Sequence, residues 1–145
     1  MASPHVADIL IHALDSIESD CLSDDTIGEL QFFLPENLIL AALDLVDHEK
    51  VIQYITPWGS RFYQVLGSNA TYSVYIDMVI APISYYCTCP AFAYAVLLSE
   101  THAMCKHVLA TWISRRLSRC LDRPVTSDDL LHVLSRQLGP EETSL

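Results

Sequence analysis

Positively charged residues are scarce in this 145-residue sequence. It contains 8 lysines and arginines against 18 aspartates and glutamates, a net charge of −10 at pH 7. Such a chain does not bind nucleic acid along its whole surface, because phosphates are recognised chiefly through cations. The sequence also lacks internal repeats and low-complexity segments, which excludes a repeat array.

The sequence likewise lacks the marks of secretion and of a membrane span. The segment MASPHVADIL has no basic stretch and places Asp8 among its apolar residues, so it does not resemble a secretory signal. We therefore expect a reducing compartment, in which an odd number of cysteines, 5, indicates metal binding or free thiols. Residues 78–99 carry no formal charge, but Pro82 and Pro90 interrupt them, and we expect no membrane span.

The length and the pattern of segments indicate one compact domain of the α+β class. Hydrophobic residues make up 51% of the chain, so we expect some apolar surface to contact a partner. We predict that this domain consists of N-terminal helices (1–49), antiparallel strands (50–86), a segment with a C-x-C pair and a C-x-H pair together with the following helix (87–121), and a C-terminal helix with a tail (122–145).

Hydrophobic periodicity places the elements within these segments. It predicts helices over 5–21, from Asp24 or Asp25 to Phe33, and from Asn37 to about Asp47. Turn residues then separate an antiparallel meander of about three strands, VIQYI, RFYQVLG and TYSVYIDMVI. The remaining predicted elements are a strand over 83–87, a short helix AFAYAVLL, a helix from Cys105 to about Leu121, and a final helix capped by Ser127 or Thr126.

The strongest chemical signal is a set of possible metal ligands, Cys87-x-Cys89 followed by Cys105-x-His107. Three thiolates and one imidazole complete the tetrahedron of a structural zinc ion and leave no position for a catalytic water. Residues two apart on an extended strand point to the same side, so Cys87 and Cys89 can hold one ion. The second pair suits the start of a helix, where the helix dipole favours a thiolate.

The sequence allows other interpretations of these residues. Each one alone is explained as a buried cysteine or a core histidine, and His102 could replace His107 as a ligand. Cys21 and Cys120 have no partner at ligand spacing, and we interpret both as ordinary cysteines. A zinc hydrolase is disfavoured because the ligand set is closed and no acid adjoins it as a general base.

These motifs resemble a known family. CTCPAF followed by CKHVLA resembles the SWIM zinc finger, whose pattern is C-x-C, a spacer and C-x-H. More narrowly, C-x-H-x-x-A, formed by Cys105, His107 and Ala110, resembles the SWIM-containing subunits of the Shu complex, as does the segment 42–68.

The resemblance implies a non-enzymatic subunit with one structural zinc ion and no small-molecule substrate. It implies pairing with a RecA-like recombinase paralogue in the nucleus, where the complex supports recombinase filaments on single-stranded DNA during homologous recombination. SWIM fingers also occur in DNA-binding and transcription-associated proteins, which is the alternative function.

Ala110 and four arginines near the finger are further candidates. Ala110 follows His107 on the same helical face, where a larger side chain would displace the helix, although alanine is also an ordinary helix former. The segment 105–123 has a net charge of +4, and its arginines are candidates for contact with DNA or a partner: Arg115, Arg116, Arg119 and Arg123. They could instead pair with the acidic first part of the chain or form a solvated face.

The aromatic residues of the predicted strands also allow two interpretations. They could form a platform on which bases stack, or they could build the core face of the sheet, which is the commoner arrangement of such strands. The residues concerned are Phe62, Tyr63, Tyr72 and Tyr75.

Overall fold

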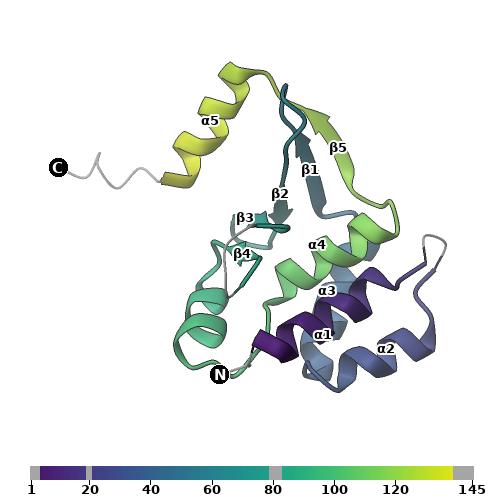
Figure 1. Cartoon of the computed structure of the whole chain (residues 1–145). Coiled ribbons are helices and arrows are strands. Elements are labelled where there is room, and N and C mark those ends of the chain that lie inside the picture. The colour runs from purple at the N-terminus through teal and green to yellow at the C-terminus, as the bar shows by residue number, and fades with distance from the viewer. Residues whose placement is uncertain (1–3, 19–20, 79–82, 139–145) are drawn as a thin grey trace.

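The computed structural model of the chain describes residues 4–18, 21–78 and 83–138 (Figure 1). Its helices are α1 (Pro4–Asp15), α2 (Asp24–Gln31), α3 (Glu36–Asp47), the π-helix η1 (Phe92–Leu98), α4 (Lys106–Arg116) and α5 (Ser127–Leu138). Its strands are β1 (Val51–Ile55), β2 (Arg61–Leu66), β3 (Thr71–Tyr75), β4 (Tyr86–Cys87) and β5 (Leu121–Pro124). The predicted α+β class is therefore confirmed. Parts of the predicted N-terminal helical segment (1–3 and 19–20), the end of the predicted third strand (79–80) and the end of the tail (139–145) lie outside the described residues.

The strands form one mixed sheet in the order β4-β3-β2-β1-β5. The predicted meander is confirmed, because β1, β2 and β3 pair antiparallel in sequence order. β5 was not predicted, and it pairs parallel to β1 with Ile52 opposite Leu121. Gln53 fixes this register, since it donates a hydrogen bond to Asp122 at 2.8 Å and accepts one from the buried Tyr63 hydroxyl at 2.9 Å.

The prediction that one helix runs from Cys105 to about Leu121 is wrong. α4 ends at Arg116, and Ser118 adopts the left-handed conformation with φ of 57°. The N–H of Arg119 then donates to the carbonyl of Ser114 at 2.8 Å, which closes a Schellman motif. Glycine normally occupies such a position, so a serine there gave no signal in the sequence.

The ends of the N-terminal helices also differ from the predicted ends, whereas the start of α5 agrees. α1 ends at Asp15, before the predicted end at residue 21. Ser23 caps α2, accepting a hydrogen bond from the N–H of Thr26 at 3.2 Å, and Pro35 occupies the N-cap of α3. Thr126 caps α5 as predicted, because it and Asp129 exchange side chain to backbone hydrogen bonds of 3.1 and 3.2 Å.

α4 lies between the N-terminal helices and the sheet (Figure 1). Every residue from His107 to Ser114 is buried, because α1 and α3 cover one side of the helix and the strands cover the other. Two side chains tie α4 to the N-terminal segment: the indole of Trp112 donates to Asp15 at 3.0 Å, and the guanidinium of Arg116 donates to the carbonyl of Ile17 at 3.0 Å. The core therefore spans the first and second halves of the chain.

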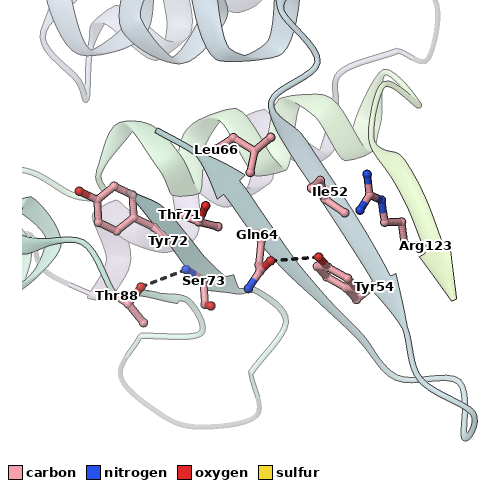
Figure 2. A pocket seen from close by; sticks show the side chains of 9 residues that line it. All are labelled: Ile52, Tyr54, Gln64, Leu66, Thr71, Tyr72, Ser73, Thr88 and Arg123. Carbon is pink, nitrogen blue, oxygen red and sulfur yellow. Dashed lines mark hydrogen bonds between the residues drawn. The ribbon is translucent and has the colours of Figure 1, made fainter. Parts of the chain in front are cut away.

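The sheet face opposite α4 contains an open concavity of about 700 Å³ (Figure 2). Strand alternation directs Val65 and Val74 to the core and leaves Gln64 and Ser73 on this second face. The side chains of Tyr54 and Gln64 form a hydrogen bond of 3.0 Å across it, and Arg123 of β5 stands at its side. Among the described residues no helix is both long and apolar enough to cross a membrane.

Replacing Asp15 with alanine tests the tie between α1 and α4. The change removes the acceptor of the Trp112 indole, whose residue is only 1% exposed, so we expect the free energy of unfolding to fall by about 1 to 3 kcal/mol. The measurement is the urea midpoint at an unchanged m value. Asp8→Ala is the matched control, because Asp8 is an exposed acid on the same helix. Equal losses in the two variants would contradict the role assigned to Asp15.

Candidate metal centre

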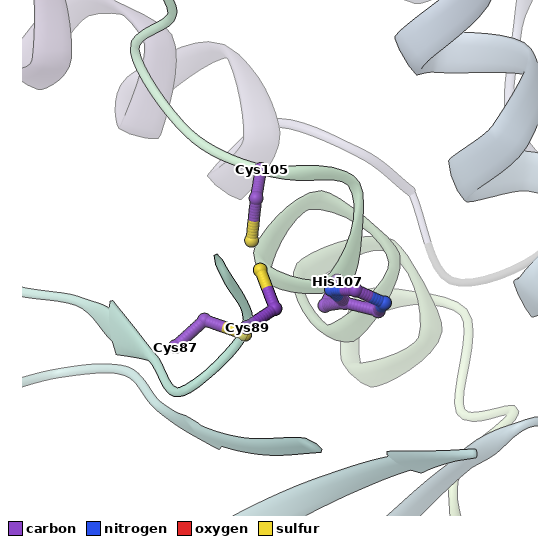
Figure 3. Close-up of side chains that lie close together, drawn as sticks. All are labelled: Cys87, Cys89, Cys105 and His107. Atoms are coloured by element: carbon purple, nitrogen blue, oxygen red, sulfur yellow. The ribbon is translucent and has the colours of Figure 1, made fainter. Parts of the chain in front are cut away.

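The chain brings Cys87, Cys89, Cys105 and His107 together at the junction of the sheet and α4 (Figure 3). Cys87 ends β4, whose pairing with β3 holds it opposite Val74. Cys105 is the N-cap residue of α4, and His107 lies in the first turn, as the spacing predicts. The possible ligand atoms all lie within 4.8 Å of one another, and all four residues are buried.

The chemistry of this cluster fits zinc. Three sulfurs and one imidazole nitrogen are the donors of a closed tetrahedral site, and the spread of the donors is compatible with Zn–S bonds of about 2.3 Å. The Nδ1 atom of His107 is buried and has no hydrogen-bond partner among the described residues. A buried imidazole nitrogen without a partner is costly, and a bound cation would satisfy it. The cluster is therefore suited to one zinc ion.

Hydrogen bonds among the three cysteines shift the pKa values of the Cys87 and Cys89 thiols in opposite directions. Hydrogen bonds from Cys105 and Cys87 lower the pKa of the Cys89 thiol. Hydrogen bonds to Cys105 and Cys89, together with burial, raise the pKa of Cys87. The backbone N–H of Phe92 also donates to the sulfur of Cys89 at 3.3 Å. Zinc supplies the positive charge that keeps several thiolates together, so its binding displaces protons.

Neighbouring side chains hold the ligand segments in place, and the sequence did not reveal these contacts. Thr88, between the first two cysteines, accepts a hydrogen bond from the N–H of Ser73 at 2.9 Å and so joins the ligand segment to β3. The hydroxyl of Tyr85 donates to the carbonyl of Ala103 at 2.5 Å, which fixes the segment before Cys105. Tyr72 packs against the ring of His107, with 4.7 Å between ring centroids. These contacts fix the positions of the ligand segments and the orientation of the His107 ring.

The remaining cysteines and the competing histidine lie elsewhere. His102 does not belong to the cluster found among the described residues, and its ring approaches the hydroxyl of Thr101 at 3.3 Å. Cys21 is exposed and Cys120 is half-buried. Burial, followed by the nearby charge of Asp122, raises the pKa of Cys120 to about 12, so it is an unreactive thiol at neutral pH.

The arginines do not lie along one helix, since only Arg115 and Arg116 belong to α4. Arg115 forms an ion pair with Asp77 and packs over Trp112, with 5.7 Å from its guanidinium carbon to the ring centroid. Arg119 follows the helix and approaches Asp47 at 3.7 Å. The basic segment thus pairs largely with the acidic first part of the chain, which was the alternative to contact with DNA or a partner.

The aromatic residues do not form an exposed stacking platform. Tyr63 is 1% exposed and belongs to the core beneath α4, whereas Phe62, 6% exposed, stacks between Tyr54 and Tyr75 on the other face of the sheet. On that face the rings of Tyr54, Phe62 and Tyr75 therefore pack against one another. Arg123 remains the basic residue beside the concavity on that face.

Comparison with known proteins adds independent support. A family model described as SWIM zinc finger matches residues 72–114, which contain the whole cluster. The chain is 34% identical over 137 residues to Zinc finger SWIM domain-containing protein 7 of Mus musculus, covering 92% of this chain and 86% of the relative. It is 35% identical over 135 residues to the protein of that name in Danio rerio, covering 91% of each. For the Homo sapiens protein the identity is 35% over 118 residues, covering 81% of this chain and 79% of the relative. No solved structure matches.

Metal removal should unfold the second half of the chain. Without the ion, the buried donors that join β4 to α4 repel or lose their partners, so we expect chelation to abolish the native melting transition. Cys87→Ser should have the same effect, whereas Cys21→Ser should not, because Cys21 is exposed and separate from the cluster. Elemental analysis and thermal unfolding measure the outcome, with one zinc expected per chain.

The histidines provide a second matched pair. We expect His107→Asn to lose zinc and His102→Asn to retain it, since only His107 lies among the clustered donors. A chelated protein with native melting behaviour, or zinc retained by Cys87→Ser and His107→Asn, would contradict the metal assignment.

Ala110→Thr tests the packing behind the finger. Ala110 is 0% exposed, so added atoms must displace neighbours in a close-packed core, at a cost of about 1 to 3 kcal/mol. We expect a lower melting temperature and faster transfer of zinc to a chelator. Ala93→Thr is the control, because Ala93 is exposed on η1. Unchanged stability and zinc retention in Ala110→Thr would show that the position is an ordinary helix former.

Proposed function

Because the chain belongs to the zinc finger SWIM domain-containing protein 7 family, we propose that it is a non-enzymatic, zinc-organised subunit of a Shu-type complex. In this role it pairs with a RecA-like recombinase paralogue in the nucleus, and the complex supports recombinase filaments on single-stranded DNA. The resemblance of CTCPAF, CKHVLA and segment 42–68 to the SWIM subunits of that complex supports the proposal.

The observation that carries the proposal is the closed and buried ligand set. Four protein donors satisfy a zinc ion, so the metal offers no position for a substrate or for an activated water. A metal of this kind organises a surface. The function is then binding of another macromolecule, without a chemical step.

The pairing of the arginines supports a protein partner in preference to DNA. Arg115 and Arg119 lie beside Asp77 and Asp47, and Arg116 donates to a backbone carbonyl, so these cations are already engaged within the chain. The net charge of −10 would repel phosphates from the rest of the surface. Contact with single-stranded DNA is therefore made through the complex.

A DNA-binding or transcription-associated regulator is the second candidate. Arg123 favours it, because this residue stands beside the open concavity of the sheet and has no ion pair among the described residues. Such a regulator would bind DNA as an isolated chain, and the affinity would fall steeply with salt.

Purification of the tagged full-length chain from cells distinguishes these functions. We expect a RecA-like protein and one zinc per chain to remain bound, and we expect Cys87→Ser, but not Cys21→Ser, to lose both. We also expect the isolated chain to bind single-stranded DNA far more weakly than the purified complex. Absence of any RecA-like protein with the native chain, or equal DNA affinity of the chain and the complex, would overturn the proposal.

A further inference from the structure

An uncharged apolar surface lies on η1, the helix between the two pairs of zinc ligands. The run from residue 78 to residue 99 contains no formal charge. On η1, Tyr94, Leu97 and Leu98 are 68%, 47% and 76% exposed. Exposed large apolar residues close together on one short element are typical of an interaction site. A π-helix is also rare, and it occurs frequently at functional sites.

A groove of about 360 Å³ separates η1 from α3. Half of the ten residues that line it are apolar and come from both elements or from the segment before α4: Leu38, Ala41, Ala91, Ala95 and Met104. Leu40, on the α3 side, is also 58% exposed. Each of the two elements therefore also exposes apolar surface outside the groove lining.

One residue gives the groove a definite charge. Lys106 is exposed. Among the described residues that line the groove, it is the only lysine, arginine, aspartate or glutamate. It has no ion pair among the described residues. In a chain with a net charge of −10, an unpaired lysine beside an apolar groove is complementary to an apolar segment that carries a carboxylate.

The groove is unsuited to the other common classes of occupant. Nucleic acid and anionic lipid surfaces both require several cations, and the groove provides one lysine. A second copy of this chain would bring another net charge of −10 into contact with the first. A protein segment with apolar anchors and an acidic neighbour satisfies both the groove and the lysine.

We propose that the groove between α3 and η1 binds an apolar segment of the RecA-like partner, and that an acidic residue of this segment pairs with Lys106. This proposal rests on the proposed function and assigns the surface through which the partner binds. The zinc site fixes the η1 side of the groove and the segment that carries Lys106, because Cys89 precedes η1 and Cys105 and His107 flank Lys106. Metal loss therefore removes the binding surface together with the fold around it.

Variants within the full-length chain test this assignment against the purified RecA-like paralogue. Ala95→Glu places an acid in the groove, where it repels the acidic segment and occupies its space, so we expect the Kd to rise at least tenfold. Ala93→Glu is the matched control, since Ala93 is exposed on the same helix and does not line the groove. Ala41→Glu, on the opposite wall, repeats the test if Ala95→Glu fails to retain zinc.

Reversal of the lysine charge tests the electrostatic part. We expect Lys106→Glu to weaken binding several-fold, and the loss should shrink as salt increases because screening reduces the contribution of the ion pair. Lys50→Glu is the matched control, an exposed lysine outside the groove. Zinc content and melting temperature are measured for every variant.

The outcomes separate the two proposals. If the native chain does not bind the paralogue, the proposed function fails. If the native chain binds and the groove variants bind equally well while retaining zinc, the groove assignment is overturned and the proposed function stands. Light scattering that shows a dimer of the native chain, lost in Ala95→Glu, would also overturn the assignment, because a second copy would then occupy the groove.

Discussion

The contact between four buried donors and one metal ion determines the geometry of this protein. Cys87 and Cys89 come from the end of the sheet, and Cys105 and His107 come from the start of α4. Both pairs hold one ion, which together with the hydrogen bond from Tyr85 to the Ala103 carbonyl sets the angle at which α4 leaves the sheet. Because α4 is buried along most of its length, that angle also sets where the N-terminal helices can pack.

Charge has a structural use here that its distribution along the sequence does not suggest. Along the sequence, the acidic first part and the basic segment after the finger suggest two separate regions, of which the basic one would bind nucleic acid. In the fold, Arg115 pairs with Asp77, and Arg116 reaches the backbone at Ile17. The contact of Arg116 is partly buried, so solvent screens it less than the ion pair of Arg115, whose partner Asp77 is exposed. The arginines therefore join distant parts of the chain.

Features that depend on residues close together in the sequence could be predicted, whereas features that depend on distant residues could not. The ligand set could be predicted because each pair is adjacent in sequence and cysteine and histidine have few alternative roles at that spacing. The meander could be predicted because turn residues separate its strands. β5 could not, since its pairing with β1 depends on residues about 70 positions apart and on Ser118, which ends α4 without the usual glycine. Extending this helix to about Leu121 also placed Arg119 on it, so one missed helix end produced a second error.

The position of η1 links the metal to the surface that we assign to the partner. An isolated helix of seven residues is unstable in water, and a π-helix has less favourable geometry than an α-helix, so η1 requires support from both ends. Cys89 anchors the segment that enters it, and Cys105 anchors the segment that leaves it. Phe92 and Val96 supply the remaining support by inserting into the core. The other side of η1 is thereby free to expose Tyr94 and Leu98 at little further cost in stability, because the zinc site and the core already hold the backbone. A spacer fixed in this way can present apolar side chains to a partner without ordering them at the moment of binding, which reduces the entropic cost of association.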